Sequence, residues 1–137
     1  MSEKAVHYPL IDDEQAEIRA ASGRPLAEIT VDAAMAEELA ALDLRISRET
    51  LRRQAEAAEA AGYPQLAHNL RRAAELIDVP NDELLRMYNA LRPHRSTYDI
   101  LQALAQVLEH KYQAPINAAF VREAADVYRE RGLLRKI

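Results

Sequence analysis

From Ser47 onward, apolar side chains recur at helical spacing, and polar or charged side chains fill most positions between them. The Ser47 hydroxyl can accept hydrogen bonds from the first turn of a helix that Gly62 is suited to end. Pro64 is suited to begin a second helix, and Pro80 marks its end. The sequence therefore predicts a helical hairpin. Its two apolar stripes are Leu51, Ala55, Ala58 and Ala61, and Leu66, Leu70, Ala73, Ala74 and Ile77.

The last two predicted helices also have recognisable starts. Ser96 and Asp99 have capping-box spacing, and Pro115 is a good first residue for the final helix. The expected apolar positions are Leu101, Leu104, Leu108 and Tyr112 in the first, and Ile116, Ala119, Phe120, Ala124, Val127 and Tyr128 in the second. Because the connections are short, consecutive helices should pack as antiparallel neighbours around one Leu/Ala core.

The first thirty residues are weakly patterned. Residues 12–21 predict a short acidic helix that stops at Gly23, and Thr30 can cap a second short helix. Residues 42–46 are expected to be a connector. We therefore predict an amino-terminal arm over residues 1–30, with a short helix, and an all-α domain over residues 31–137.

The composition favours the same fold class. The chain contains only three glycines, and aromatic residues make up 5% of it, so the core must consist mainly of Ala, Leu, Ile and Val. Small side chains suit helices that pack closely, and the shortage of glycine disfavours tight hairpins and phosphate-binding loops. The prediction is a compact all-α domain of about five main helices with a looser arm.

Charge and motifs argue against several function classes. The net charge of −4 disfavours nucleic-acid binding, and no apolar run approaches the roughly 20 residues of a membrane span. The absence of cysteine excludes thiolate sites, and no two of the four histidines have helical metal-ligand spacing. No nucleophile elbow or phosphate-binding glycine motif occurs. We therefore expect no catalytic, cofactor-binding or metal-binding residue in this chain.

The stretch YNALRPHRST, residues 88–97, is the least generic part of the sequence. The helix predicted over residues 83–91, with Leu84, Tyr88 and Leu91 on one face, is stopped by Pro93. Arginines on both sides of this proline have partly fixed positions. They can cap the carbonyl groups of the preceding helix or make another contact within the chain, or they can bind a carboxylate of a partner. The residues alone slightly favour the capping or intramolecular role. The candidate interface residues are Tyr88, Arg92, Pro93, His94 and Arg95.

Several segments together carry a resemblance to a known family. AAELIDVPND, YNALRPHRST and AAFVREAA, supported by ISRETLRRQA and KYQAPINAAFVREAADVY, resemble the small (gamma) subunit of adenosylcobalamin-dependent diol and glycerol dehydratases. The resemblance covers about residues 8–131. The departures are modest: the family often has tyrosine where His94 stands and cysteine near Asn117, and the chain ends soon after the last helix.

The resemblance implies an all-α, non-catalytic subunit that supports assembly and stability. Its partners would be a large (alpha) barrel subunit that holds the substrate and a medium (beta) subunit, in a dimer of heterotrimers. The enzyme would convert propane-1,2-diol or glycerol to the aldehyde and water by radical chemistry. The other subunits would bind the adenosylcobalamin and supply the catalytic and metal-binding residues. The expected location is the cytoplasm, either free or inside a bacterial microcompartment.

A stand-alone helical adaptor, acting as a protein-interaction module, is the alternative from a different class. Residues 57–80 loosely resemble one tetratricopeptide unit, with a small-residue helix, a Gly-Tyr turn and a terminal proline. Only one copy is found, whereas solenoids need about three repeats to bury a continuous core. A plain helical hairpin therefore explains this segment better.

Overall fold

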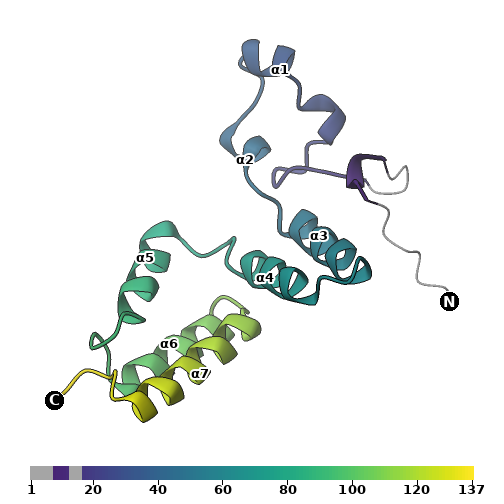
Figure 1. The fold of residues 1–137 in the computed structure, drawn as a ribbon. Coiled ribbons are helices and arrows are strands. Elements are labelled where there is room, and N and C mark those ends of the chain that lie inside the picture. Colours follow the sequence, from purple (N-terminus) through teal and green to yellow (C-terminus); the bar gives the residue numbers. More distant parts are fainter. Residues whose placement is uncertain (1–7, 13–16) are drawn as a thin grey trace. The chain divides into compact units, whose positions relative to one another are not determined.

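The computed structural model describes residues 8–12 and 17–137 (Figure 1). Over these ranges the secondary structure is helical, apart from one isolated bridge between Arg19 and Pro25, which confirms the all-α prediction. The chain consists of two compact units, Met1–Ile77 and Asp78–Ile137. The predicted boundary at residue 30 lies within the first unit and stays a prediction.

The first unit contains short elements followed by a long hairpin. The short elements are the 3-10 helices η1 (Leu10–Asp12) and η2 (Leu26–Glu28) and the α-helices α1 (Val31–Met35) and α2 (Ala41–Leu44). The hairpin consists of α3 (Arg48–Ala60) and α4 (Pro64–Glu75), which lie side by side in Figure 1. Since these are the only long helices of the described part of this unit, the hairpin is its main packing element.

The predicted ends of the hairpin helices are largely confirmed. The Ser47 side chain accepts a hydrogen bond from the backbone N–H of Thr50 at 3.4 Å, and Pro64 is the first residue of α4. Gly62 has a φ of 88°, a left-handed conformation that glycine adopts readily. However, α4 ends at Glu75, about one turn before Pro80.

Alanine sets the spacing of this hairpin. Ala55, Ala58 and Ala67 form its buried centre, and Leu70 packs against them. Side chains of this size let the two helix backbones approach closely. The predicted small-residue stripe of α3 is therefore the packing surface in the structure, although Ala61 lies at the exposed turn.

Two predictions in the amino-terminal part are wrong. Of the predicted acidic helix, residues 13–16 lie outside the described part, and residues 17–21 are not helical. Their backbone pairs locally instead, because Leu26 N donates to Ile18 O at 3.0 Å and Ala20 N to Arg24 O at 2.9 Å. The expected connector at residues 42–46 contains part of α2. Thr30 does cap α1 as predicted, accepting from Ala33 N at 3.1 Å.

The second unit contains α5 (Asn81–Ala90), α6 (Tyr98–His110) and α7 (Pro115–Arg131). The helices α6 and α7 lie side by side (Figure 1). Leu101 and Ala105 of α6 and Ala118 and Ala125 of α7 are each 0% exposed. The predicted main helices are therefore confirmed as α3 to α7. Each unit has buried residues of its own, and the prediction of one core shared by all the helices stays a prediction.

The apolar stripe predicted for α7 is wrong by about one position. Ala119 and Phe120 are exposed, and the buried residues of the helix are Asn117, Ala118, Val121 and Ala125. Side chains at neighbouring helix positions point about 100° apart, so α7 has two apolar faces. The face with the smaller side chains is buried, and it permits close approach of α6. The face with Phe120 is exposed.

Candidate partner interface

The structure brings the predicted interface residues to the connection between α5 and α6. Tyr88 is 65% exposed, and Arg92, Pro93, His94 and Arg95 are also exposed. We call residues 88–97 the arginine turn. The exposure of these five side chains is the property that a docking surface requires, although Tyr88 does not share the half-buried state of Leu84 and Leu91, with which it was predicted to share a face.

The inward face of α5 explains the exposure of Tyr88. Met87 is buried, with 7% exposure, and Leu84 and Leu91 are half-buried on the same side. Leu85 is 64% exposed and precedes Tyr88 by three positions, and Arg92 follows at the seventh. This spacing places Leu85 and Tyr88 on one outward face of α5, and Arg92 follows beyond the end of the helix. Leu85 was not among the predicted interface residues, although its i, i+3 spacing to Tyr88 on one helix indicates a shared face.

The backbone of the arginine turn is tightly folded. Arg92 N donates to Asn89 O and Arg95 N donates to Arg92 O, each at 3.2 Å. His94 has a φ of 67°, an uncommon left-handed conformation for a residue with a side chain. Its N–H donates to Leu133 O at 2.7 Å. A hydrogen bond from the C-terminal segment therefore helps to hold the turn at its most strained residue.

Two hydroxyl groups satisfy the last carbonyls of α5. Ser96 Oγ donates to Ala90 O at 2.7 Å, and Tyr128 Oη donates to Leu91 O at 2.6 Å. The predicted cap at Ser96 is thus wrong for the start of α6, where Thr97 Oγ1 accepts from Ile100 N at 3.3 Å. Ser96 closes the preceding helix instead.

The capping role considered for the arginines is consequently filled by other residues. Among the residues that the structure describes, the guanidinium groups of Arg92 and Arg95 have no hydrogen bond or ion pair. Carbonyl groups at the end of α5 receive their donors from Ser96 and Tyr128. The interpretation that slightly favoured capping is therefore wrong, and the arginine charges remain available to a partner.

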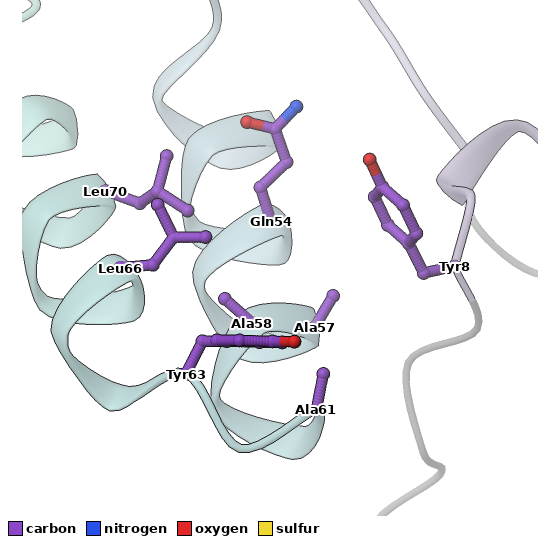
Figure 2. A pocket seen from close by; sticks show the side chains of 8 residues that line it. All are labelled: Tyr8, Gln54, Ala57, Ala58, Ala61, Tyr63, Leu66 and Leu70. Carbon is purple, nitrogen blue, oxygen red and sulfur yellow. The ribbon is translucent and has the colours of Figure 1, made fainter.

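A shallow apolar hollow of about 500 Å³ lies on the α3–α4 hairpin (Figure 2). Its lining residues are Tyr8, Gln54, Ala57, Ala58, Ala61, Tyr63, Leu66 and Leu70. Figure 2 shows the alanine methyl groups and both leucines on the two helices, with Tyr8 facing them from the amino-terminal segment. The lining contains no carboxylate, histidine or basic side chain, so it offers no acid–base pair for catalysis.

Among the described residues Asp43 is the most enclosed carboxylate, and its side chain is 4% exposed. It accepts hydrogen bonds from the Ser22 hydroxyl and from Ala40 N, the latter at 2.7 Å, and Arg24 Nε lies 3.2 Å away. The Ser22 hydrogen bond above all, then the Ala40 amide and the Arg24 charge, hold the pKa of Asp43 below its usual value. These contacts hold Ser22, Arg24 and Ala40 around Asp43 and favour its ionised carboxylate form.

Glu109 has a similar partner in the other unit. The hydrogen bond and charge of Arg122 lower the pKa of Glu109. A general acid near neutral pH needs a raised pKa, so neither shifted carboxylate is suited to that role. Within residues 8–12 and 17–137, no group of three or more potential ligands could hold a metal ion. In the same ranges, no helix combines the length and the apolar character that a bilayer crossing requires.

Comparison with known proteins assigns these features to a family. Residues 3–135 match the sequence model of the dehydratase small subunit. The chain belongs to the dehydratase small-subunit family. This dehydratase small subunit is 48% identical to the propanediol dehydratase small subunit of Citrobacter freundii over 132 residues, which are 96% of the chain and 77% of that relative. It is 47% identical to the protein of the same name from Salmonella typhimurium, over 98% of the chain and 78% of the relative.

The match to the family spans both units, including the arginine turn and most of the C-terminal segment. A dehydratase small subunit is one component of a multi-subunit enzyme and therefore has partner subunits. Exposed residues such as Leu85, Tyr88 and Arg92 can accordingly be judged as candidate contacts with those partners.

Proposed function

We propose that this chain is the small subunit of an adenosylcobalamin-dependent diol dehydratase. The enzyme converts propane-1,2-diol or glycerol to the corresponding aldehyde and water by a radical mechanism. The observation that carries the proposal is the identity of 48% and 47%, over nearly the whole chain, with two proteins named propanediol dehydratase small subunit. The role of this chain is to support the assembly and stability of the catalytic subunit. The enzyme is located in the cytoplasm, either free or inside a microcompartment.

The chemistry in this proposal belongs to partner subunits. A large barrel subunit holds the substrate, a medium subunit helps to bind the cobalamin, and two heterotrimers associate. The apolar hollow on α3 and α4 does not fit a corrinoid, because its lining has no histidine to approach cobalt and offers the amide groups only Gln54 and the hydroxyls of Tyr8 and Tyr63. The cofactor, whose cobalt–carbon bond supplies the radical, is therefore assigned to the other subunits.

The arginine turn is proposed as a contact with the large subunit. Tyrosine and arginine are enriched among the residues that dominate binding energy at protein interfaces. Here, exposed Tyr88 belongs to the same turn as Arg92 and Arg95, whose guanidinium groups have no partner among the described residues, and exposed Leu85 precedes it. The turn backbone is already fixed by hydrogen bonds, so less ordering is needed on binding. We propose the amino-terminal arm, residues 1–30, as a second contact with the large subunit, beside the turn carried by the all-α domain of residues 31–137.

Co-expression with the large and medium dehydratase subunits tests the proposal. A tag on the large subunit should retain the wild-type chain, and the purified complex should convert propane-1,2-diol with added adenosylcobalamin. Omitting the small subunit should reduce soluble, active enzyme. A chain that never co-purifies and leaves activity unchanged would instead be a stand-alone helical adaptor.

The variant R92A/R95A tests the turn itself. We expect weaker co-purification while the isolated variant keeps the helical circular dichroism of the wild type. The matched control R52A/K111A removes two exposed charges outside the turn and should assemble normally. Equal assembly of both variants would exclude the arginine turn as a docking contact.

A further inference from the structure

The C-terminal segment, residues 133–137, lies against the arginine turn (Figure 1). Leu133 O accepts from His94 N at 2.7 Å, and Arg135 N donates to Ser96 O at 2.8 Å. Both hydrogen bonds join backbone groups, so they fix the path of the segment whatever its side chains contact. The yellow end of the chain accordingly runs beside the connection between α5 and α6.

This path brings additional positive charge to the turn. Leu133 and Arg135 join the segment to His94 and Ser96 through their backbones, and the side chains of Arg135 and Lys136 are exposed. We call Arg92, Arg95, Arg135 and Lys136 the basic surface. Its cations come from two segments that are distant in sequence, and so the sequence pattern did not reveal it.

Three of the other four arginines of this unit, all except Arg131, form ion pairs with carboxylates. Arg86 pairs with Glu83 at 2.9 Å, Arg129 pairs with Asp126 at 3.4 Å, and Arg122 pairs with Glu109. In the described part of the chain, no carboxylate lies within ion-pair distance of the basic surface. Unpaired like charges at one place repel one another, and an external group with negative charge would relieve that repulsion.

We propose that the basic surface binds a cluster of carboxylates on a partner subunit of the dehydratase. This inference rests on the proposed function and extends its docking site to the C-terminal segment. Arginine can pair with a carboxylate through two parallel hydrogen bonds, which suits acidic protein side chains. Exposed Leu85 and Tyr88, on the helix that leads into the turn, add apolar area, which favours a protein partner over a polyanion. The chain's net charge of −4 also disfavours nucleic acid.

Charge reversal in the C-terminal segment provides the test. The variant R135E/K136E changes side chains only, whereas the segment is held through its backbone. The matched control R52E/K111E reverses two exposed charges elsewhere; Lys111 follows the opposite end of α6, about 20 Å along the helix from the turn. The binding of each full-length chain to the purified large–medium subunit complex is measured at about 0.05 M and about 0.3 M salt.

We expect R135E/K136E to bind at least about tenfold more weakly than wild type at low salt, and the control to change binding less than about threefold. Added salt should weaken the wild type and reduce the difference between wild type and variant, since screening removes long-range attraction. Neutral R135Q/K136Q should lie between them. Circular dichroism of each variant verifies that the chain is folded.

The outcomes separate the two proposals. If the wild-type chain does not bind the subunit complex, the proposed function fails. If wild type and R135E/K136E bind equally at both salt concentrations, the basic surface is not a docking site, while the proposed function stands. Tighter binding of the wild type to anionic phospholipid vesicles or duplex DNA than to the subunits would overturn the assignment of a protein partner.

Discussion

Residues 17–46 and the α6–α7 hairpin are stabilised in different ways. In the hairpin, Leu101, Ala105, Ala118 and Ala125 are fully buried, so apolar packing holds the helices together. In residues 17–46, the buried residues are Ala33 and the charged Asp43. The hydrogen bonds of that segment converge on the Asp43 carboxylate rather than on an apolar centre.

The difference is visible in where apolar side chains lie. Val31 and Met35 of α1 are 76% and 79% exposed, and Leu44 of α2 is 68% exposed. The segment therefore gains little stability from burial, and a few polar contacts determine its conformation. Segments with few buried contacts open locally at lower free energy than packed hairpins. We expect α6 and α7 to resist perturbations that release residues 17–46.

Truncating Leu101, the largest fully buried side chain of the described residues, should lower the free energy of unfolding the most. Leu101→Ala deletes apolar contacts and leaves a cavity in the α6–α7 hairpin, at a cost of about 2–5 kcal/mol in unfolding free energy. Urea unfolding followed by circular dichroism measures the change. The neighbouring variant Ile100→Ala, at a position that is 40% exposed, is the control and should cost far less. Equal losses would show that apolar packing does not dominate this hairpin.

The Tyr128 hydroxyl, which donates to the carbonyl at the end of α5, should contribute less to the free energy of unfolding. Tyr128→Phe leaves Leu91 O without the donor that lies 2.6 Å away, and we expect a loss of about 1 kcal/mol in unfolding free energy. Tyr88→Phe removes an exposed hydroxyl and should have almost no effect. Indistinguishable unfolding midpoints for these two variants would contradict the assigned role of Tyr128.

Asp43 should stabilise the conformation of residues 17–46 without affecting the α6–α7 hairpin. Asp43→Asn removes the charge that pairs with Arg24 and weakens the hydrogen bonds with Ser22 and Ala40. We expect faster hydrogen exchange of the Ala40 amide, with unchanged exchange in α6 and α7. Glu37→Gln, at an exposed acidic position, is the charge-matched control. Faster hydrogen exchange in both regions would show that residues 17–46 and the α6–α7 hairpin are not stabilised independently.

The pH dependence should follow the lowered pKa of Asp43. Its stabilising contribution is complete above the unfolded-state pKa of about 3.9 and is lost as the pH falls through the lower folded-state value. Protection of the Ala40 amide should therefore be constant above about pH 5 and decrease in more acidic solution. In Asp43→Asn this decrease should be absent. A wild-type change centred near neutral pH would exclude Asp43 as its cause.

Local signals in the sequence predicted much of the fold. Ser47, Pro64 and Pro115 act through the geometry of their own helix termini, and they start helices as expected. The inward face of α7 could not be read in this way, because Phe120 and Val121 both suit a core. Packing against α6 decides between them, and that choice depends on residues outside the local pattern.

The candidate interface was predicted only in part for the same reason. Local chemistry indicated an exposed, proline-containing turn with two arginines, and the structure places these side chains outward. It gave no indication that Ser96 and Tyr128 would replace the arginines as caps. The contact of Arg135 with Ser96 uses backbone groups, which leave no residue signature in the sequence.

The backbone hydrogen bonds between His94 and Leu133 and between Ser96 and Arg135 also order events during folding. They join residues separated by the whole of α6 and α7, so the entropy of closing this long loop must be overcome before they form. We expect α6 and α7 to pair first and the turn to reach its final geometry late. A partner that recognises the completed turn would then bind only chains whose C-terminal unit has finished folding.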